Sequence, residues 1–219
     1  MLKRFETTKL FYDEYPYKVT LKNNLGHIFR DKNLAFAKQE IDRLQQKYDQ
    51  GLPLVRVAYL KEHKYEVETF LEARDLYIEF SKQDDYKLRI QNPYMQIYSH
   101  DYDWLHYISE KIKSTFEFWE PNKKLPTLEK NVIVVEEEPE YLYKVTLDST
   151  VDANLASWIR NNPGKAKAGR TCLETIENNG FCRGFYFFVR DDKILQLLNL
   201  FIGKVQRIDK LVSYANSDK

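Results

Sequence analysis

A proline-containing and acidic stretch in the middle of the chain constrains the fold most, because it separates two lengths of ordinary strand and helix patterns. Residues 121–127 have the composition of a linker, and the run Glu136-Glu137-Glu138-Pro139-Glu140 is typical of a solvated connector. We therefore predict an N-terminal α+β unit over residues 1–124, an acidic linker over 125–140 and a C-terminal basic α+β unit over 141–219.

Strand-like and helix-like segments alternate within each predicted unit. In the first unit, helices are expected to begin at the capping residues Asn33 and Asp101, and strands are expected at 17–21, 55–60, 65–70, 76–80, 87–90 and 94–98. In the second unit, strands are expected at 142–147, 184–189 and 205–214, with helices at 152–161, 171–178 and 193–202. This order predicts a ferredoxin/RRM-like β-α-β-α-β sandwich with its helices on one face of the sheet.

One pentapeptide occurs twice. Tyr17-Lys18-Val19-Thr20-Leu21 recurs as Tyr143-Lys144-Val145-Thr146-Leu147. A duplicated domain explains the repeat, and so does chance, because valine, threonine and tyrosine are all common in strands. The sequence leaves both explanations open.

Charge and motif content exclude several classes of protein. The 34 basic and 33 acidic residues cancel to +1, which excludes a polycation that coats nucleic acid by bulk charge, although residues 141–219 carry 12 basic and 8 acidic residues. The sequence contains no nucleotide-binding glycine motif, no kinase motif and no Gly-x-Ser-x-Gly elbow, so we expect no cofactor and no enzymatic activity. The two cysteines, Cys172 and Cys182, are too few for a disulfide framework. A secretion signal and a membrane span are not recognisable, so we expect a cytoplasmic protein without membrane contact.

The segment from Arg183 to Arg190 carries the first candidate site. It resembles the strand signature of RNA-recognition-motif domains, which begins with a basic residue, a glycine and an aromatic residue. Arg183, Gly184, Phe185 and Phe187 fit that signature, whereas the three positions occupied by Tyr186, Phe188 and Arg190 depart from it. On a strand, Tyr186 and Phe188 share the face opposite Phe187, so an exposed aromatic platform for bases and a strand buried on both faces are the two alternatives.

The loop RNNPGKAKAGR, from Arg160 to Arg170, is the second candidate site. It contains four basic residues and no acidic residue. Lys165, Lys167 and Arg170 are expected to contact phosphates, together with exposed backbone N–H groups. A solvated loop without a ligand explains the same composition.

These features predict a non-enzymatic protein that binds single-stranded RNA or DNA, of the kind expected for a viral or phage accessory factor. The expected nucleic-acid-binding residues are basic or aromatic: Arg160, Lys165, Lys167, Arg170, Arg183, Phe185, Tyr186 and Arg190. The alternative is a protein–protein adaptor that modulates a host or replication enzyme. A third reading is a metal-dependent hydrolase built on His100, Asp103 and His106.

Overall fold

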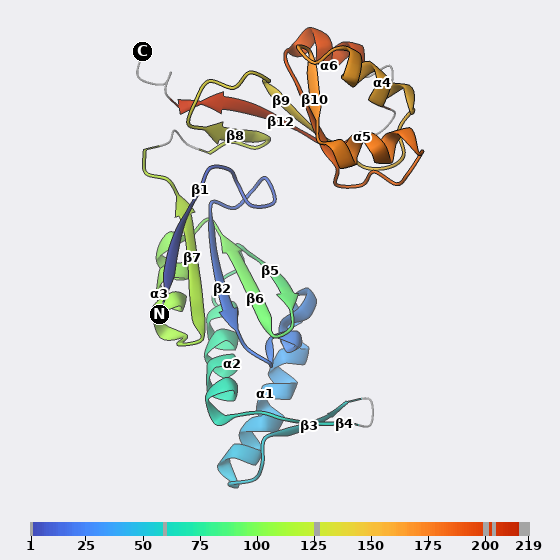
Figure 1. Ribbon diagram of the computed structural model, residues 1–219. Coiled ribbons are helices and arrows are strands. Elements are labelled where there is room, and N and C mark those ends of the chain that lie inside the picture. The colour runs from blue at the N-terminus through green and yellow to red at the C-terminus, as the bar shows by residue number, and fades with distance from the viewer. Residues whose placement is uncertain (1, 59–60, 125–127, 199–201, 203–204, 215–219) are drawn as a thin grey trace. The chain divides into compact units, whose positions relative to one another are not determined.

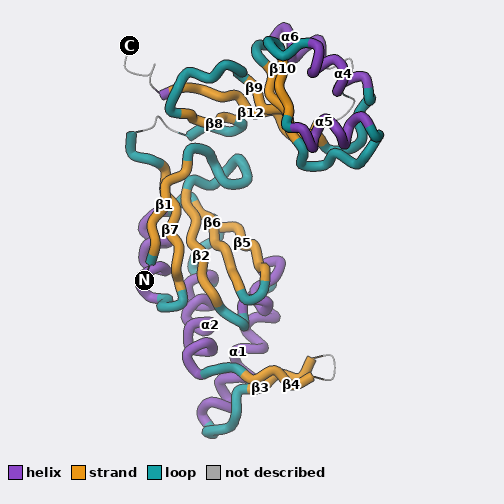
Figure 2. The backbone as a smooth tube through the Cα atoms, in the orientation of Figure 1, coloured by secondary structure: helices purple, strands orange, loops and turns teal. Residues whose placement is uncertain are grey.

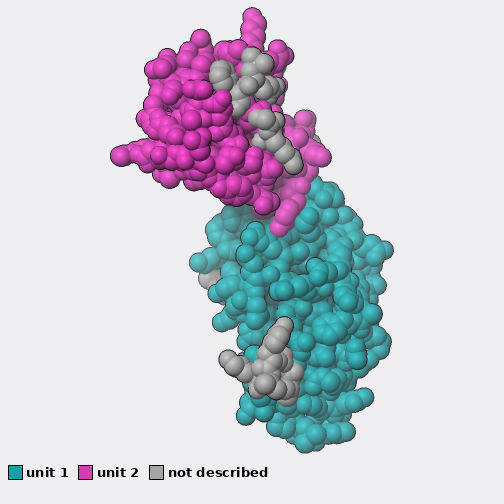
Figure 3. All heavy atoms as spheres, turned by 90° about the vertical axis from the view of Figure 1, so that its right-hand side faces the viewer, with its two compact units in different colours: residues 1–7, 14–122 teal, residues 8–13, 123–219 magenta. Residues whose placement is uncertain are grey.

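The computed structural model describes residues 2–58, 61–124, 128–198, 202 and 205–214. The chain divides into two compact units, which Figure 3 shows in different colours. The first unit comprises residues 1–7 and 14–122, and the second comprises residues 8–13 and 123–219. Each unit contains a five-stranded mixed sheet with helices, so the predicted α+β class is confirmed.

The first unit contains a five-stranded sheet, a short hairpin and the helices between them. Its elements are β1 (Lys3–Thr7), β2 (Tyr17–Lys22), a 3-10 segment η1 (Gly26–Lys32), α1 (Leu34–Asp49), β3 (Val55–Ala58), β4 (Lys61–Lys64), α2 (Val67–Phe80), β5 (Tyr86–Gln91), β6 (Tyr94–Ser99), α3 (Tyr102–Lys111) and β7 (Thr115–Pro121). The strand order is β1-β7-β2-β6-β5, and β3 and β4 form a separate two-stranded sheet (Figures 1 and 2).

The second unit is smaller. Its elements are β8 (Val132–Val135), β9 (Tyr143–Leu147), α4 (Asn154–Asn161), β10 (Ala166–Ala168), α5 (Arg170–Glu177), β11 (Tyr186–Val189), α6 (Asp192–Leu198) and β12 (Val205–Ser213). The strand order is β10-β11-β9-β12-β8. The ferredoxin/RRM-like detail of the predicted fold is not confirmed and remains a prediction.

The two sheets have the same strand order and the same pairing directions. In each, the middle strand, β2 or β9, pairs antiparallel with both of its neighbours. A parallel strand, β1 or β8, forms one edge, and an antiparallel strand, β5 or β10, forms the other. The two copies of the repeated pentapeptide are these two middle strands.

The register repeats as well. The pentapeptide lysines occupy matching positions, because Lys18 pairs with Trp119 and Lys144 pairs with Asp209. Both ladders contain an irregularity directly after the pentapeptide threonine. The helices α3 and α6, which follow β6 and β11, also begin alike. The side chain of the aspartate before each helix, Asp101 or Asp191, accepts a backbone N–H three residues later, at 2.9 or 3.0 Å. The chain therefore uses one topology twice.

The buried side chains of each unit form one core on the helix side of its sheet. In the first unit, Val19 and Leu21 of β2 are buried with residues of α1, α2 and α3. In the second, Val145 and Leu147 of β9 are buried with residues of α4, α5 and α6. Because side chains alternate along a strand, the intervening residues of each sheet lie on the opposite face, which we call the helix-free face.

Two predicted strands of the first unit are wrong. Residues 65–70 and 76–80 were expected as strands, but α2 runs continuously from Val67 to Phe80. Its buried residues Phe70, Ala73 and Leu76 recur every third position, which is the spacing of one helix face. The aromatic residues at the two ends of this segment gave it the composition of strands.

Short strands also occur where the sequence predicts connections. Val132–Val135, within the predicted acidic linker, is β8 and pairs with β12. Ala166–Ala168, within the predicted basic loop, is β10, and Lys61–Lys64 is β4. Residues 59–60 of one predicted strand and residues 199–201 of one predicted helix lie outside the described residues.

The N-cap of α3 gives a stability prediction. Replacing Asp101 by alanine is expected to lower the free energy of unfolding by about 1 kcal/mol, because the backbone N–H of Trp104 loses its acceptor. Asp101→Asn keeps an acceptor oxygen and serves as the matched control. Urea denaturation followed by circular dichroism measures both, and an equal loss in the two variants would contradict a capping role.

Candidate nucleic-acid interface

The helix-free face of the second sheet carries aromatic and basic side chains. Along β11, Phe187 and Val189 are fully buried in the core, whereas Tyr186 is 45% exposed and Phe188 is half-buried. Lys144 and Lys167 flank Phe188 in the register of the sheet, from β9 and β10. The aromatic strand is therefore buried in the core on one face, and it is partly exposed on the other.

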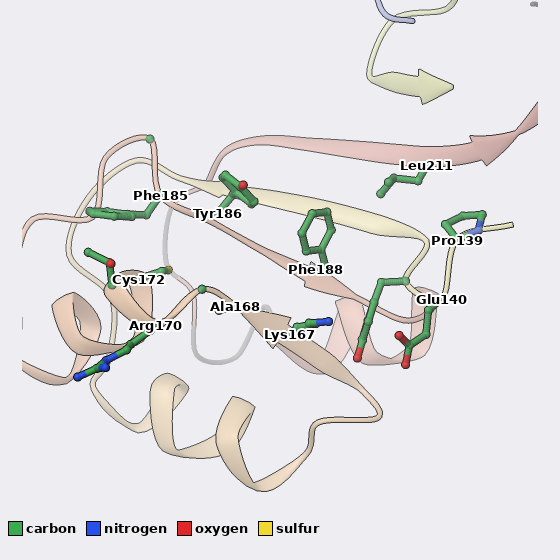
Figure 4. Close-up of a pocket in the computed structure, with 14 residues that line it drawn as sticks. Pro139, Glu140, Lys167, Ala168, Arg170, Cys172, Phe185, Tyr186, Phe188 and Leu211 are labelled. Carbon is green, nitrogen blue, oxygen red and sulfur yellow. The ribbon is translucent and has the colours of Figure 1, made fainter. Parts of the chain in front are cut away.

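A pocket of about 600 Å³ lies on this face (Figure 4). Tyr186 and Phe188 line it from β11, Lys167 from β10 and Leu211 from β12. The start of α5, from Gly169 to Cys172, and the segments Pro139–Tyr141 and Gly184–Phe185 also line it. The pocket combines a mostly apolar floor with basic side chains at its margin.

The aromatic residues of the pocket have defined mutual geometry. The rings of Tyr186 and Phe188 meet edge to face, with centroids 5.6 Å apart and an interplanar angle of 78°. The ammonium nitrogen of Lys144 lies 4.1 Å from the centre of the Tyr186 ring. This cation–π contact holds the Lys144 side chain across the sheet, beside the aromatic pair.

Charges of both signs lie near Lys144 on this face. Burial lowers its pKa, and the nearby charges of Lys9 and Arg207 lower it further, while Asp209 opposes them. Arg207 itself is engaged, because its guanidinium bonds to both oxygens of Asp13 at 3.0 and 3.1 Å and lies 2.7 Å from Asp209. The carboxylates thus neutralise Arg207 more directly than they neutralise Lys144.

Lys167 and Arg170 supply the remaining positive charge at the pocket. Lys167 is exposed on β10, and in the part of the chain that the structure describes it forms no ion pair. Arg170 is the first residue of α5, and its Nε lies 2.7 Å from Glu174 Oε1. Because the Arg170 side chain is 88% exposed, this pair is weak and a phosphate can compete for the guanidinium.

Four predicted site residues lie outside this pocket. Arg160 forms a two-pronged ion pair with Glu177, at 2.9 and 3.0 Å. Arg183 lies 3.9 Å from Asp148, and Arg190 donates to the carbonyl of Gly164 at 3.2 Å. Lys165 is exposed in the turn before β10, and its carbonyl accepts the backbone N–H of Arg190.

The structure brings the other four predicted residues together. Lys167, Arg170, Phe185 and Tyr186 all line the pocket, although Phe185 also packs against the core. The sequence analysis did not assign Lys144, Phe188 or Leu211 to the site. Alternation along β11 already placed Phe188 on one face with Tyr186, whereas Lys144 and Leu211 come from other strands, whose register only the structure gives.

The histidines proposed for a metal site do not converge. His100 Nδ1 lies 2.9 Å from Asp85, and His106 Nδ1 lies 3.7 Å from Glu110. Among the described residues there is no group of three or more histidine, cysteine, aspartate or glutamate side chains that could hold a metal ion. The geometry therefore gives the hydrolase reading no support.

The cysteines give a reactivity prediction. Cys172 and Cys182 are buried thiols, and burial, with a smaller contribution from Cys182, raises the pKa of Cys172 to about 11. At pH 8 the folded protein is expected to react slowly with iodoacetamide, whereas the protein unfolded in urea is expected to react fast, because only the thiolate is nucleophilic. Since the folded pKa exceeds the ordinary value of 9.0, folding stability is expected to fall as pH rises from 9 to about 11. Mass spectrometry of alkylated protein measures the first effect, and rapid native labelling would contradict it.

Comparison of the chain with known protein families, curated proteins and solved structures found no match. None of the helices that the structure describes combines the length and the apolar character needed to cross a lipid bilayer. The candidate interface therefore rests on the geometry of the chain itself.

Proposed function

We propose that this protein binds single-stranded nucleic acid without catalysing a reaction, through the helix-free face of its second sheet. One observation carries the proposal: an aromatic pair, the exposed Tyr186 and the half-buried Phe188, lies on the helix-free sheet face beside Lys144 and Lys167. Proteins that bind single strands combine stacking rings with cations that follow the backbone.

The mechanism is electrostatic capture followed by stacking. Lys167 and Arg170 bind phosphates at the margin of the pocket, where both side chains are exposed. A base then stacks against Phe188 or Tyr186, which is worth about 1–3 kcal/mol per base. The half-buried ammonium of Lys144 adds attraction for the strand, since it lies beside both rings.

The ferredoxin/RRM-like fold predicted for the second unit is part of the same proposal. The segment β9-α4-β10-β11-α6-β12 follows a β-α-β-β-α-β order, and its four strands pair antiparallel in the order β10-β11-β9-β12. This supports a ferredoxin/RRM-like unit with α5 inserted between β10 and β11 and with β8 added at one edge. RNA-recognition-motif domains use the open face of such a sheet to stack bases.

Fluorescence anisotropy tests the proposal. Labelled single-stranded RNA, single-stranded DNA and duplex are titrated with the full chain at two salt concentrations. We expect salt-sensitive binding with a preference for single strands, and Phe188→Ala is expected to weaken it about 5- to 150-fold, which corresponds to the 1–3 kcal/mol of one stacked base.

The same titration distinguishes nucleic-acid binding from the alternative function, a protein–protein adaptor. If no probe binds at low salt, nucleic-acid binding is refuted. The pocket would then be assigned to a protein partner, whose identity a pull-down with the full chain would address. If duplex binds as tightly as single strands, the stacking mechanism is contradicted.

A further inference from the structure

A further pocket, of about 520 Å³, lies beside the pocket of Figure 4 on the second sheet. Polar side chains of β9 and β12 line it: Lys144, Thr146, Gln206 and Arg207. Tyr186 of β11, which is 45% exposed, lines both pockets. The volume is within the range of about 300–1,000 Å³ that is typical of sites for small organic groups.

The segment Thr8–Asp13, which belongs to the second unit, also forms part of this wall. Asp13 lines the pocket from it, so we call the cavity the Asp13 pocket. The two carboxylate oxygens of Asp13 accept from Nη1 of Arg207 at 3.0 and 3.1 Å. The Asp13 side chain is still 22% exposed, and a carboxylate has about four lone-pair sites. It can therefore accept a further hydrogen bond from a ligand.

The charges around the Asp13 pocket balance. Lys144 and Arg207 are basic and line it together with the acidic Asp13. A second carboxylate, Asp209, is 1% exposed and lies 2.7 Å from Nε of Arg207. Carboxylates repel a phosphate, so this pocket suits the neutral, hydrogen-bonding edge of a base better than it suits the backbone of the strand.

Asp13 and Arg207 present an acceptor beside a donor. A guanidinium has five N–H donors, and the contacts of Arg207 with Asp13 and Asp209 use those at Nη1 and Nε, so the donors at Nη2 can serve a ligand. Cytosine and adenine carry the complementary pair on one edge, an amino group beside an acceptor ring nitrogen. Uracil and thymine carry a carbonyl oxygen in place of that amino group, and a carboxylate repels it.

We propose that the Asp13 pocket binds a base that carries an amino group, cytosine or adenine, with the Asp13 carboxylate accepting a hydrogen bond from that group. The proposal rests on the function proposed above, because this base belongs to the strand that stacks in the neighbouring pocket. It gives that surface a preference among bases, which stacking alone does not provide. Hydrogen bonds to the base edge also leave the Lys144 ammonium in place, 4.1 Å from the centre of the Tyr186 ring.

Two strands that differ in the amino group provide the test. Labelled oligo(C) and oligo(U) of equal length, as RNA and as DNA, are titrated with the full chain at slightly alkaline pH, where cytosine is neutral. We expect the cytosine strand to bind about tenfold more tightly, because one hydrogen bond to a charged group accounts for a factor of this size. Both strands carry the same phosphates, so this ratio is expected to be the same at low and at high salt.

The variant Asp13→Asn is expected to reduce the ratio to below about twofold, because an amide can donate to the uracil carbonyl as well as accept from the cytosine amino group. Asparagine tolerates the left-handed backbone of this position, where φ is 59°. Glu177→Gln is the matched control, since Glu177 ends α5 and bonds to Arg160 outside the pocket. Circular dichroism verifies that both variants are folded.

The outcomes separate this proposal from the one on which it rests. Binding of both strands with equal affinity, or tighter binding of oligo(U), would overturn the Asp13 pocket alone. A cytosine preference that Asp13→Asn leaves intact, or that both variants lose equally, would also overturn it. Absence of binding to every probe would overturn both proposals. A preference that is lost in Asp13→Asn, kept in Glu177→Gln and kept in the weaker-binding Phe188→Ala would support the Asp13 pocket.

Discussion

The double substitution Lys167→Glu with Arg170→Glu is expected to weaken the binding of single-stranded nucleic acid about 25-fold at ~0.1 M salt. Both side chains are exposed at the margin of the pocket, where each is placed to contact one phosphate. A single strand releases about 0.7 counterions per neutralised phosphate, so the slope of log K against log salt should become shallower by about 1.4. Anisotropy titrations at several salt concentrations measure both quantities.

Lys193→Glu is the matched control for this double variant. Lys193 is exposed on α6, on the helix side of the same sheet, so its reversal changes the net charge of the unit without reaching the pocket. If Lys193→Glu weakened binding per charge as much as the double variant does, the affinity would come from the overall charge of the unit. The role assigned to Lys167 and Arg170 would then be refuted.

Local patterns predicted the parts of this fold that depend on near neighbours in sequence. The caps at Asn33 and Asp101 are confirmed, because each side chain accepts a backbone N–H three residues later. The alternation along 186–189 is confirmed too, since Phe187 and Val189 are buried and Tyr186 is exposed. Such features follow from the geometry of a single turn or strand.

The charge content of residues 141–219 was a poorer guide to the site, because counting charges does not show which of them are paired. Arg160 and Arg183 looked like candidates for phosphate binding, but they lie against Glu177 and Asp148. Glu177 is 17 residues from Arg160 in the chain, and only the packing of α4 beside α5 brings the two together. Lys167 lacks such a carboxylate among the described residues, and this distinction requires the fold.

The repeated topology could be recognised only from the structure. Five matching residues were compatible with chance, whereas a shared strand order, register and helix cap are not explained by strand propensity. Outside the pentapeptide, equivalent positions hold different side chains of similar burial, such as Ile108 and Leu198, which are both fully buried. Cores tolerate such exchanges of apolar residues, so similarity of packing survives where similarity of sequence does not.

Truncation of two neighbouring residues of β11 is expected to have different effects: one variant should lose stability, and the other should lose nucleic-acid binding. Phe187→Ala should lower the free energy of unfolding of the second unit by about 3–5 kcal/mol, because the ring is fully buried and its loss leaves a cavity. Phe188→Ala, one residue later, should cost under about 1 kcal/mol of stability, since its ring lies on the helix-free face. Stability and nucleic-acid binding are thus expected to separate at adjacent positions of one strand.

Urea denaturation followed by tryptophan emission measures this contrast for the second unit alone. Trp158 packs against the second core, so a background carrying Trp104→Phe and Trp119→Phe leaves it as the reporter of that unit. The midpoint should fall strongly for Phe187→Ala and little for Phe188→Ala, while only Phe188→Ala, measured under folding conditions, should show weakened binding with an intact fold. If Phe188→Ala unfolded the unit as readily as Phe187→Ala, β11 would be buried on both faces and the aromatic platform would not exist.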